Sequence, residues 1–155
     1  AQANAMAGDD RSLNGIFNLE VENIDMKAGN TYTVAFASDQ IASTEGYQGT
    51  LQLNDVELID IEYGIATAEN FGLRYVTEGQ ITTSWNGKAR AEDVLFSLVI
   101  RPSMDAQISD VISINSRYTA AEAYGNGTTM DMGINFHRGV VPSRFFEIYQ
   151  NTPNP

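Results

Sequence analysis

Residues 46–64 of the chain, GYQGTLQLNDVELIDIEYG, decide its fold class. In the first half, Tyr47, Leu51 and Leu53 share one parity and polar residues take the other, which is the period of a strand with one buried face. In the second half, apolar residues fall on both parities, so we expect a strand that is covered on both sides. An Asn-Asp pair at 54–55 separates the halves and favours a turn. The stretch predicts two strands joined by a short polar corner.

The same alternation recurs along the chain. Residues 17–21 and 32–36 each place apolar side chains at every second position. Only residues 40–44 and 66–70 lean toward helix, and both are too short to be independent helices. Asn-Gly pairs suit tight hairpin turns, and the chain has Asn14-Gly15, Asn86-Gly87 and Asn126-Gly127. We therefore expect an all-β jelly-roll β-sandwich of about nine strands.

Composition limits the classes of function. The chain has 155 residues, which predicts one domain, and its 43% hydrophobic content is enough for a core. Its net charge of -11 argues against binding to nucleic acid or anionic membranes. The chain has no cysteine, so disulfides and thiol chemistry are excluded. No apolar run is long enough for membrane insertion.

Several stretches resemble cohesins, the jelly-roll modules that capture dockerins in cellulose-degrading assemblies. The resemblance begins with residues 46–61, in which a strand, an Asn-Asp corner and a Val-Glu-Leu-Ile strand follow one another. Four further stretches fit in the same order: VENIDMKAGNTYTVAF at 21–36, GQITTSWN at 79–86, VLFSLVIR at 94–101 and YTAAEAYGNGTTMDM at 118–132. The resemblance covers roughly residues 16–138. It implies a non-catalytic protein-binding or adhesion module.

The last segment, RFFEIYQNTPNP at 144–155, resembles the opening of the C-terminal sorting domain carried by substrates of type IX secretion. The matching positions are Tyr149, Gln150, Asn151, Pro153, Asn154 and Pro155. This resemblance implies export to the exterior or outer surface of a Gram-negative bacterium, and a trimmed or removed sorting domain after Pro155. A proline-rich linker is the alternative. We expect a flexible lead at 1–15, a cohesin-like sandwich at 16–143 and the start of the sorting signal at 144–155.

The resemblance to cohesins also implies where a partner binds, namely the open face of one sheet. By strand parity, the outward polar groups of that face are Gln48, Thr50, Gln52, Gln80, Thr82 and Ser84. Such groups form a flat hydrogen-bonding surface that suits a protein partner. The same alternation is also typical of any solvated sheet face.

The sequence gives little support for an enzyme or a metal site. His137 is the only histidine, and its parity places it outward beside Asp131 and Asn135, without a nucleophile. No cofactor is predicted. Asp9 and Asp10 are the only calcium ligands considered, and a lone acidic pair near a terminus is more often solvated. The first ten residues lack the basic start and apolar centre of a signal peptide, so we expect that a signal was removed or that a longer chain was cut.

Two other functions stay open. A structural subunit of a fibre or sheath would assemble by adding a strand or an arm, such as residues 1–12, to a neighbour's sheet. A carbohydrate-binding module of a secreted hydrolase would bind polysaccharide on an exposed aromatic platform. The candidate rings for that platform are Tyr47, Tyr63, Tyr75 and Trp85, although the parity of Trp85 predicts that it points inward.

Overall fold

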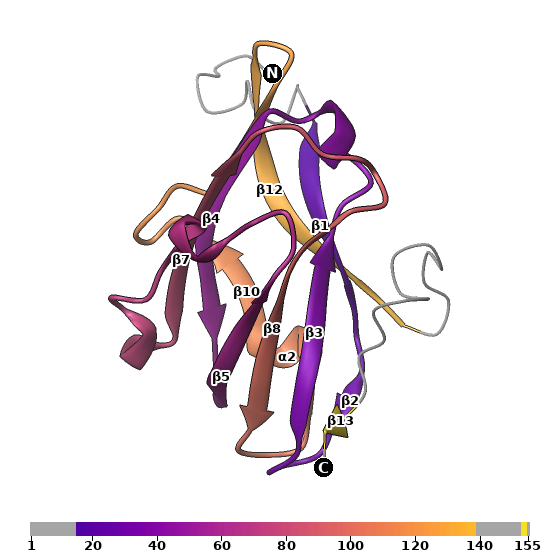
Figure 1. Cartoon of the computed structure of the whole chain (residues 1–155). Coiled ribbons are helices and arrows are strands. Elements are labelled where there is room, and N and C mark those ends of the chain that lie inside the picture. The colour runs from indigo at the N-terminus through magenta and orange to yellow at the C-terminus, as the bar shows by residue number, and fades with distance from the viewer. Residues whose placement is uncertain (1–14, 139–152, 155) are drawn as a thin grey trace, which may run out of the picture.

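The structure is a computed structural model that describes residues 15–138 and 153–154 (Figure 1). Its strands are β1 (Ile16–Glu22), β2 (Asp25–Met26), β3 (Thr31–Ala37), β4 (Gly46–Leu53), β5 (Val56–Tyr63), β6 (Phe71–Gly72), β7 (Gln80–Asn86), β8 (Val94–Pro102), β9 (Ala106–Gln107), β10 (Ile112–Asn115), β11 (Glu122–Gly125), β12 (Thr128–His137) and β13 (Pro153–Asn154). Short helices are η2 (Ile41–Ser43), η3 (Ala68–Asn70), η4 (Val76–Glu78) and α2 (Ile108–Val111). The all-β class is confirmed, and nine of these strands are longer than two residues.

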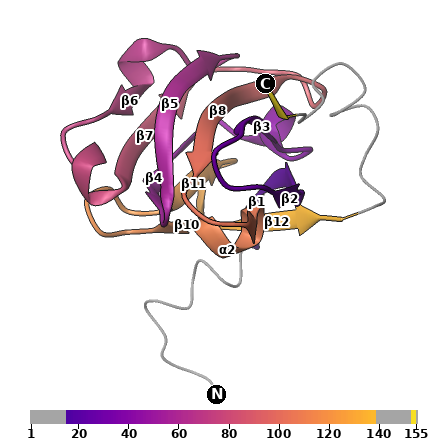
Figure 2. The ribbon, with the colours of Figure 1, turned by 90° about the horizontal axis from the view of Figure 1, so that it is seen from below.

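The strands form a curled sheet with two layers. Their order is β5-β8-β3-β1-β12-β11-β4-β7-β6, with β10 also paired to β4 and β13 to β3. β1 and β12 run parallel, and this pair joins the two layers. Viewed from below, the ends of the order, β5 and β6, lie on the same side of the molecule, so the sheet curls around its core (Figure 2). This is the predicted jelly-roll sandwich.

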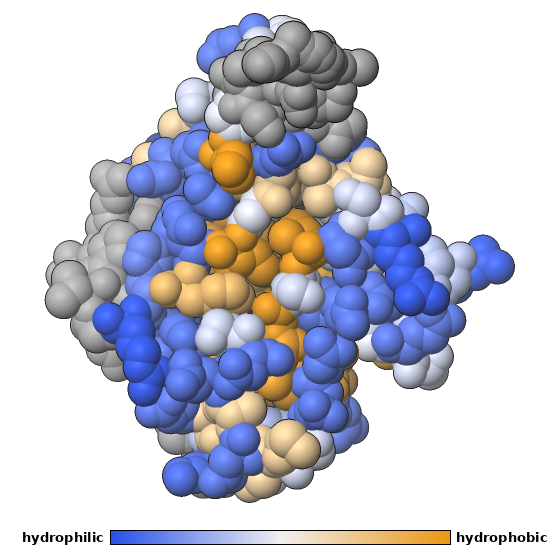
Figure 3. Space-filling model, turned by 180° about the vertical axis from the view of Figure 1, so that it is seen from behind, coloured by the Kyte–Doolittle hydropathy of each residue, from blue (hydrophilic) through white to orange (hydrophobic). Residues whose placement is uncertain are grey.

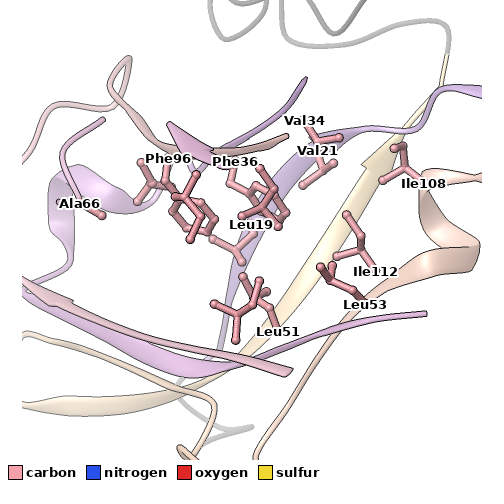
Figure 4. Close-up of a cluster of buried hydrophobic side chains, with 14 of the residues drawn as sticks. Leu19, Val21, Val34, Phe36, Leu51, Leu53, Ala66, Phe96, Ile108 and Ile112 are labelled. Carbon is pink, nitrogen blue, oxygen red and sulfur yellow. The ribbon is translucent and has the colours of Figure 1, made fainter. Parts of the chain in front are cut away.

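The core lies between the layers and follows the predicted parities. Figure 4 shows side chains from both layers pointing into it. The Phe36 and Phe96 rings stack with their centroids 4.7 Å apart. Full burial of one Leu or Phe side chain contributes roughly 1.5–3 kcal/mol, so this cluster is the main source of stability. Its members from β1, β3 and β4 are Phe17, Leu19, Val21, Tyr32, Val34, Phe36, Tyr47, Leu51 and Leu53.

Two of the predicted turns are present, whereas Asn86-Gly87 forms no hairpin because β7 does not pair with the following β8, and Asn14 lies outside the described residues. Asp55 at the corner between β4 and β5 has a φ of 60°, the left-handed conformation that Asn and Asp tolerate. Asn126 and Gly127 both have positive φ values, of 54° and 74°, and they join β11 to β12. Two consecutive left-handed residues define the tight hairpin turn that Asn-Gly favours. Helices η2 and η3 lie within the two stretches predicted to lean toward helix.

The expectation that residues 56–63 form a strand covered on both sides is wrong. Among the described strands, β5 pairs with β8 alone and ends the sheet order. Leu58 and Asp60 pair with neighbouring residues of β8, so Ile59 is the extra residue of a β-bulge. The bulge shifts the inward parity by one residue. Ile61 is therefore buried while Ile59 is 41% exposed, and this shift explains apolar residues on both parities.

Some sequence predictions lie outside the described residues. They concern most of the lead at 1–15, the calcium pair Asp9 and Asp10, and the sorting segment at 144–155 except for Pro153 and Asn154. Those two residues pair antiparallel with β3, opposite Tyr32 and Thr31. Within the described part of the chain, no helix has the length and apolar character that crossing a membrane requires.

Candidate functional site

The six predicted partner residues lie on one side of the sheet, pointing away from the core. We call this side of β11, β4, β7 and β6 the outer face. The register pairs Gln48 with Ser84, Thr50 with Thr82 and Gln52 with Gln80, so the three pairs form successive rows. The alternate residues of β7 point inward, because Ile81, Thr83 and Trp85 are all buried. Gln80, Thr82 and Ser84 therefore point to the outer face, as predicted. The predicted set is therefore contiguous.

The expectation that this face is flat and open is wrong at Thr50 and Gln80. Thr50 has 0% of its surface exposed, and Gln80 has 3%. The segment between β10 and β11 crosses the outer face at Thr50. The Oγ1 of Thr50 accepts hydrogen bonds from the N–H groups of Tyr118, at 3.2 Å, and Thr119, at 2.9 Å. Thr50 is thus committed to internal bonds and is unavailable to a partner.

A pair of stacked tyrosines extends this cover toward β7. The rings of Tyr75 and Tyr118 are 3.7 Å apart and within 1° of parallel. The backbone of Tyr75 also accepts a hydrogen bond from the N–H of Gln80, at 3.1 Å. We call residues 73–79 and 116–121 the cover. It closes the half of the outer face nearest the C-terminal end of β4.

Ionic groups hold the stacked pair in place. The Tyr118 hydroxyl donates a hydrogen bond of 2.5 Å to the Glu78 carboxylate. That carboxylate lies 3.8 Å from the Arg117 guanidinium, which sits 5.2 Å from the centre of the Tyr118 ring. The hydrogen bond to Glu78 is the main reason why the pKa of Tyr118 is raised above its ordinary value. The cover is consequently an ordered cluster of side chains.

The other half of the outer face is an open hollow of about 430 Å³. Gln48 and Ser84 from the predicted set line it, and Gly46, which lies opposite Asn86 in the next row, adds no side chain. Asn70 closes one side and donates a hydrogen bond of 2.8 Å to the backbone carbonyl of Ser84. The remaining lining residues are Glu45, Tyr47, Trp85, Asn86 and Tyr124, so the hollow is polar and has an acidic group but no basic one.

No protein-family model matches the chain, and neither does any curated protein. A chain from the crystal structure of a type I cohesin–dockerin complex of Clostridium thermocellum does match, with a TM-score of 0.52 at 14% identity. The match covers 79% of this chain and all of that one. This chain has a cohesin fold.

Two further solved cohesins match over similar spans. The seventh ScaB type I cohesin of Pseudobacteroides cellulosolvens gives a TM-score of 0.42 at 14% identity, covering 81% of this chain and 97% of its own. The sixth cohesin of Acetivibrio cellulolyticus scaffoldin B, solved with a dockerin, gives 0.44 at 15% identity, covering 78% and 99%. The predicted cohesin-like sandwich is confirmed as a fold by the C. thermocellum match, whose TM-score is 0.52.

In this cohesin-like domain, the last two predicted residues, Thr82 and Gln52, are half-buried. Thr82 lies under β6 and donates a long hydrogen bond, of 3.5 Å, to the carbonyl of Gly72. Gln52 bonds to Asn54 and Asn115 through its two amide atoms, at 3.0 Å each. Only Gln48 and Ser84 of the six therefore face the open hollow.

The four candidate rings of a sugar-binding platform do not form one in the cohesin-like domain. Tyr47 and Trp85 are buried, at 1% and 8% exposure, and they stack on each other inside. Burial raises the pKa of Tyr47, as expected for a phenol without solvent. Tyr75 is half-buried in the cover, and Tyr63, at 55% exposure, lies on β5 with its ring centre 6.1 Å from that of Phe71 in β6. The inward prediction for Trp85 is confirmed.

His137 lies on the outward parity of β12, as predicted, but it is paired rather than free. Its Nε2 contacts the carboxylate of Glu20, which is 6% exposed, and Asn135 donates a hydrogen bond of 3.4 Å to the same group. These three residues link β1 to β12. Among the described residues, no three His, Cys, Asp or Glu side chains gather to hold a metal ion.

Sequence reasoning missed most of the residues that shape the site, and it named Tyr75 only as a candidate sugar-binding ring. Tyr118, Tyr75 and Glu78 belong to segments without strand or helix periodicity, so no pattern indicated that they meet over Thr50. The missed lining residues Asn70 and Tyr124 also come from separate elements, η3 and β11. A usable signal was Ser-Arg-Tyr-Thr at 116–119, a polar insertion with an aromatic residue between two short strands.

Proposed function

We propose that this domain is a non-catalytic protein-binding module of the cell exterior, and that its partner binds at the hollow of the outer face. The fold supports the class, because the C. thermocellum structure that it matches is a cohesin in complex with a dockerin protein. Fold likeness alone does not identify a ligand, so the assignment of the site rests on the side chains of this chain.

One observation carries the assignment to the hollow. On the rest of the outer face, the polar side chains are committed to internal hydrogen bonds or covered. Within the described structure, the side chains of Gln48, Ser84 and Asn86 form no hydrogen bond, and they face the same hollow. Uncommitted donors and acceptors on a rigid sheet provide the polar part of a protein interface.

The charge of the hollow specifies the chemistry of the partner. Glu45 lies at its rim, the adjacent Glu122 accepts a hydrogen bond of 2.6 Å from Tyr124, and no lysine or arginine lines it. The whole chain carries a net charge of -11. A partner that presents amide or hydroxyl groups together with a basic side chain complements this surface, and long-range attraction would accelerate its association.

The test uses the protein that the immobilised domain captures from the secreted fraction of its source organism. Gln48→Arg combined with Ser84→Arg fills the hollow and adds positive charge, so the dissociation constant should rise at least about tenfold. Asn30→Arg is the matched control, because Asn30 is exposed and directly precedes β3, which does not line the hollow. An affinity unchanged by the double substitution would rule out the hollow.

We also infer export through type IX secretion, on the evidence of the string from Tyr149 to Pro155. The inference places the domain at the exterior or outer surface of a Gram-negative bacterium. A bacterium with this pathway should display or release the full-length precursor, and deleting one essential component of the pathway should retain it in the periplasm. Surface labelling of intact cells measures the difference. Equal labelling in both strains would contradict the inference.

A further inference from the structure

Strand β12 has one paired edge and one edge that is paired only in part. Along its first edge, residues from Asp131 to His137 pair with β1. Along its second edge, β11 pairs with residues from Thr128 to Asp131 and then ends. Among the described strands, none pairs with the second edge of β12 from Met132 to His137, although β10 approaches β12 on this side without forming a ladder with it. We call this stretch the open edge.

The direction of the hydrogen bonds shows which groups the open edge presents. The carbonyl of His137 accepts a hydrogen bond of 2.7 Å from the N–H of Asn23, which follows β1. In a parallel ladder, the backbone groups of alternate residues point to the same side. Gly133, Asn135 and His137 therefore bond to β1. The N–H and C=O groups of Met132, Ile134 and Phe136 point to the open edge.

The side chains beside this edge are apolar. Met132, Ile134 and Phe136 are half-buried against the core, as is Ile114 of β10. Seen from behind, the molecule has an apolar area in the middle of this face, surrounded by hydrophilic residues (Figure 3). A row of unpaired backbone groups beside apolar side chains is the surface that accepts an added strand.

We propose that the open edge binds residues 1–8 of a second copy of this chain as an added β-strand. This segment, AQANAMAG, contains no charged residue, although the chain as a whole is strongly acidic. Alanine occupies positions 1, 3, 5 and 7, so an extended strand would turn small apolar groups toward one side. Small groups suit a shallow apolar surface that is already half filled by core side chains.

Geometry favours a second copy over the chain's own arm. Ile16 pairs with Asp131, so the arm joins β1 at one end of the open edge and on the opposite side of β12. To reach the open edge of its own sheet, the arm would have to cross β12. This distance is two strand spacings, about 10 Å in total, and it takes roughly three residues. The next six residues, 6–11, would then lie along the edge and bring Asp9, Asp10 and Arg11 onto the apolar surface. In a neighbour, residues 9–14 instead form a tether of up to about 20 Å.

The contact joins two different surfaces, the arm of one copy and the open edge of the next. Such a contact gives a closed dimer where two copies exchange their arms, and rings or open filaments where each arm binds the next copy. This function is independent of partner binding at the hollow, because the hollow and the open edge involve different residues. It corresponds to the fibre-subunit alternative and assigns the surface that would carry it.

Amide hydrogen exchange tests the proposal at single residues. In dilute protein lacking residues 1–8, the amides of Met132, Ile134 and Phe136 should exchange rapidly. An excess of the peptide AQANAMAG should slow these three amides at least about tenfold. The amides of Gly133, Asn135 and His137 serve as the internal control, because they bond to β1 in every state. Unchanged exchange of the first three in the presence of the peptide would overturn the proposal.

Light scattering of the full chain distinguishes the second copy from the chain's own arm. Molar mass should rise with concentration for the unaltered chain and for Ala5→Ser, and it should stay monomeric for Ala5→Pro, because proline removes a backbone donor. A monomer at every concentration would overturn the proposal. Slow exchange of Met132, Ile134 and Phe136 in a dilute full-chain monomer would also overturn it, by showing that the arm binds its own sheet.

Discussion

Thr50 and Thr119 bond to each other in both directions. The Oγ1 of Thr50 donates to the carbonyl of Thr119, at 3.1 Å, and accepts from the N–H of the same residue, at 2.9 Å. This pair fastens the cover to the central strand β4 across 69 residues of sequence. It thereby divides the outer face into a closed half and the open hollow.

Replacing Thr50 with valine should destabilise the domain although the two side chains have the same shape. Valine leaves the N–H groups of Tyr118 and Thr119 without an acceptor in a buried place, which costs about 1–3 kcal/mol. Urea unfolding measures the change. Ser84→Ala on the same face is the control and should stay within about 0.5 kcal/mol, because Ser84 is exposed. Equal stability of the two variants would show that the cover does not depend on Thr50.

Tyr118 should make the stability of the domain sensitive to alkaline pH. Its pKa is raised in the folded state, so the stabilisation is fully present below the unfolded pKa of about 10 and is lost as pH rises through the folded value. Tyr118→Phe removes this titration and the bond to Glu78. Between about pH 9 and 11, the melting temperature of the unaltered protein should fall more steeply than that of the variant. Parallel curves would refute the assignment.

Asp105 should make the stability of the domain depend on pH in the opposite direction, with a loss of stability at acid pH. Its pKa is lowered, chiefly by the hydrogen bond that its carboxylate accepts from the N–H of Ala28, at 2.8 Å, and then by Lys27. A lowered pKa gives stability that is present above the unfolded value of about 4 and is lost as pH falls through the folded one. The Ala28 amide should lose its protection over that range. In Asp105→Asn, the amide should show no such step.

Parity made the buried side of the sandwich predictable. Phe17, Leu19, Val34 and Phe36 lie where a period of two places them, because each strand has one face against the core. The same rule failed at Ile59, since a bulge changes the period by one residue without any mark in composition. The edge position of β5 also depends on the order of strands, which the local pattern does not contain.

The candidate site was predictable only in part, because the path of the loops decides it. Gln48 and Thr50 are equivalent by parity, yet one lines the hollow and the other is fully buried under residues 116–121. The stacking of Tyr75 on Tyr118 joins segments that lie far apart in sequence and lack periodicity. Such contacts follow from tertiary structure, and a single sequence gives no spacing rule for them.

The central claim is that the partner binds the hollow, and amide chemical-shift mapping tests it most directly. The labelled domain is titrated with the captured partner protein, without any substitution. We predict that the largest shifts fall on Gly46, Gln48, Ser84, Asn86 and Tyr124, while β5 and β8 on the other layer stay unperturbed. Shifts concentrated on β5 and β8, with the hollow unchanged, would contradict the account.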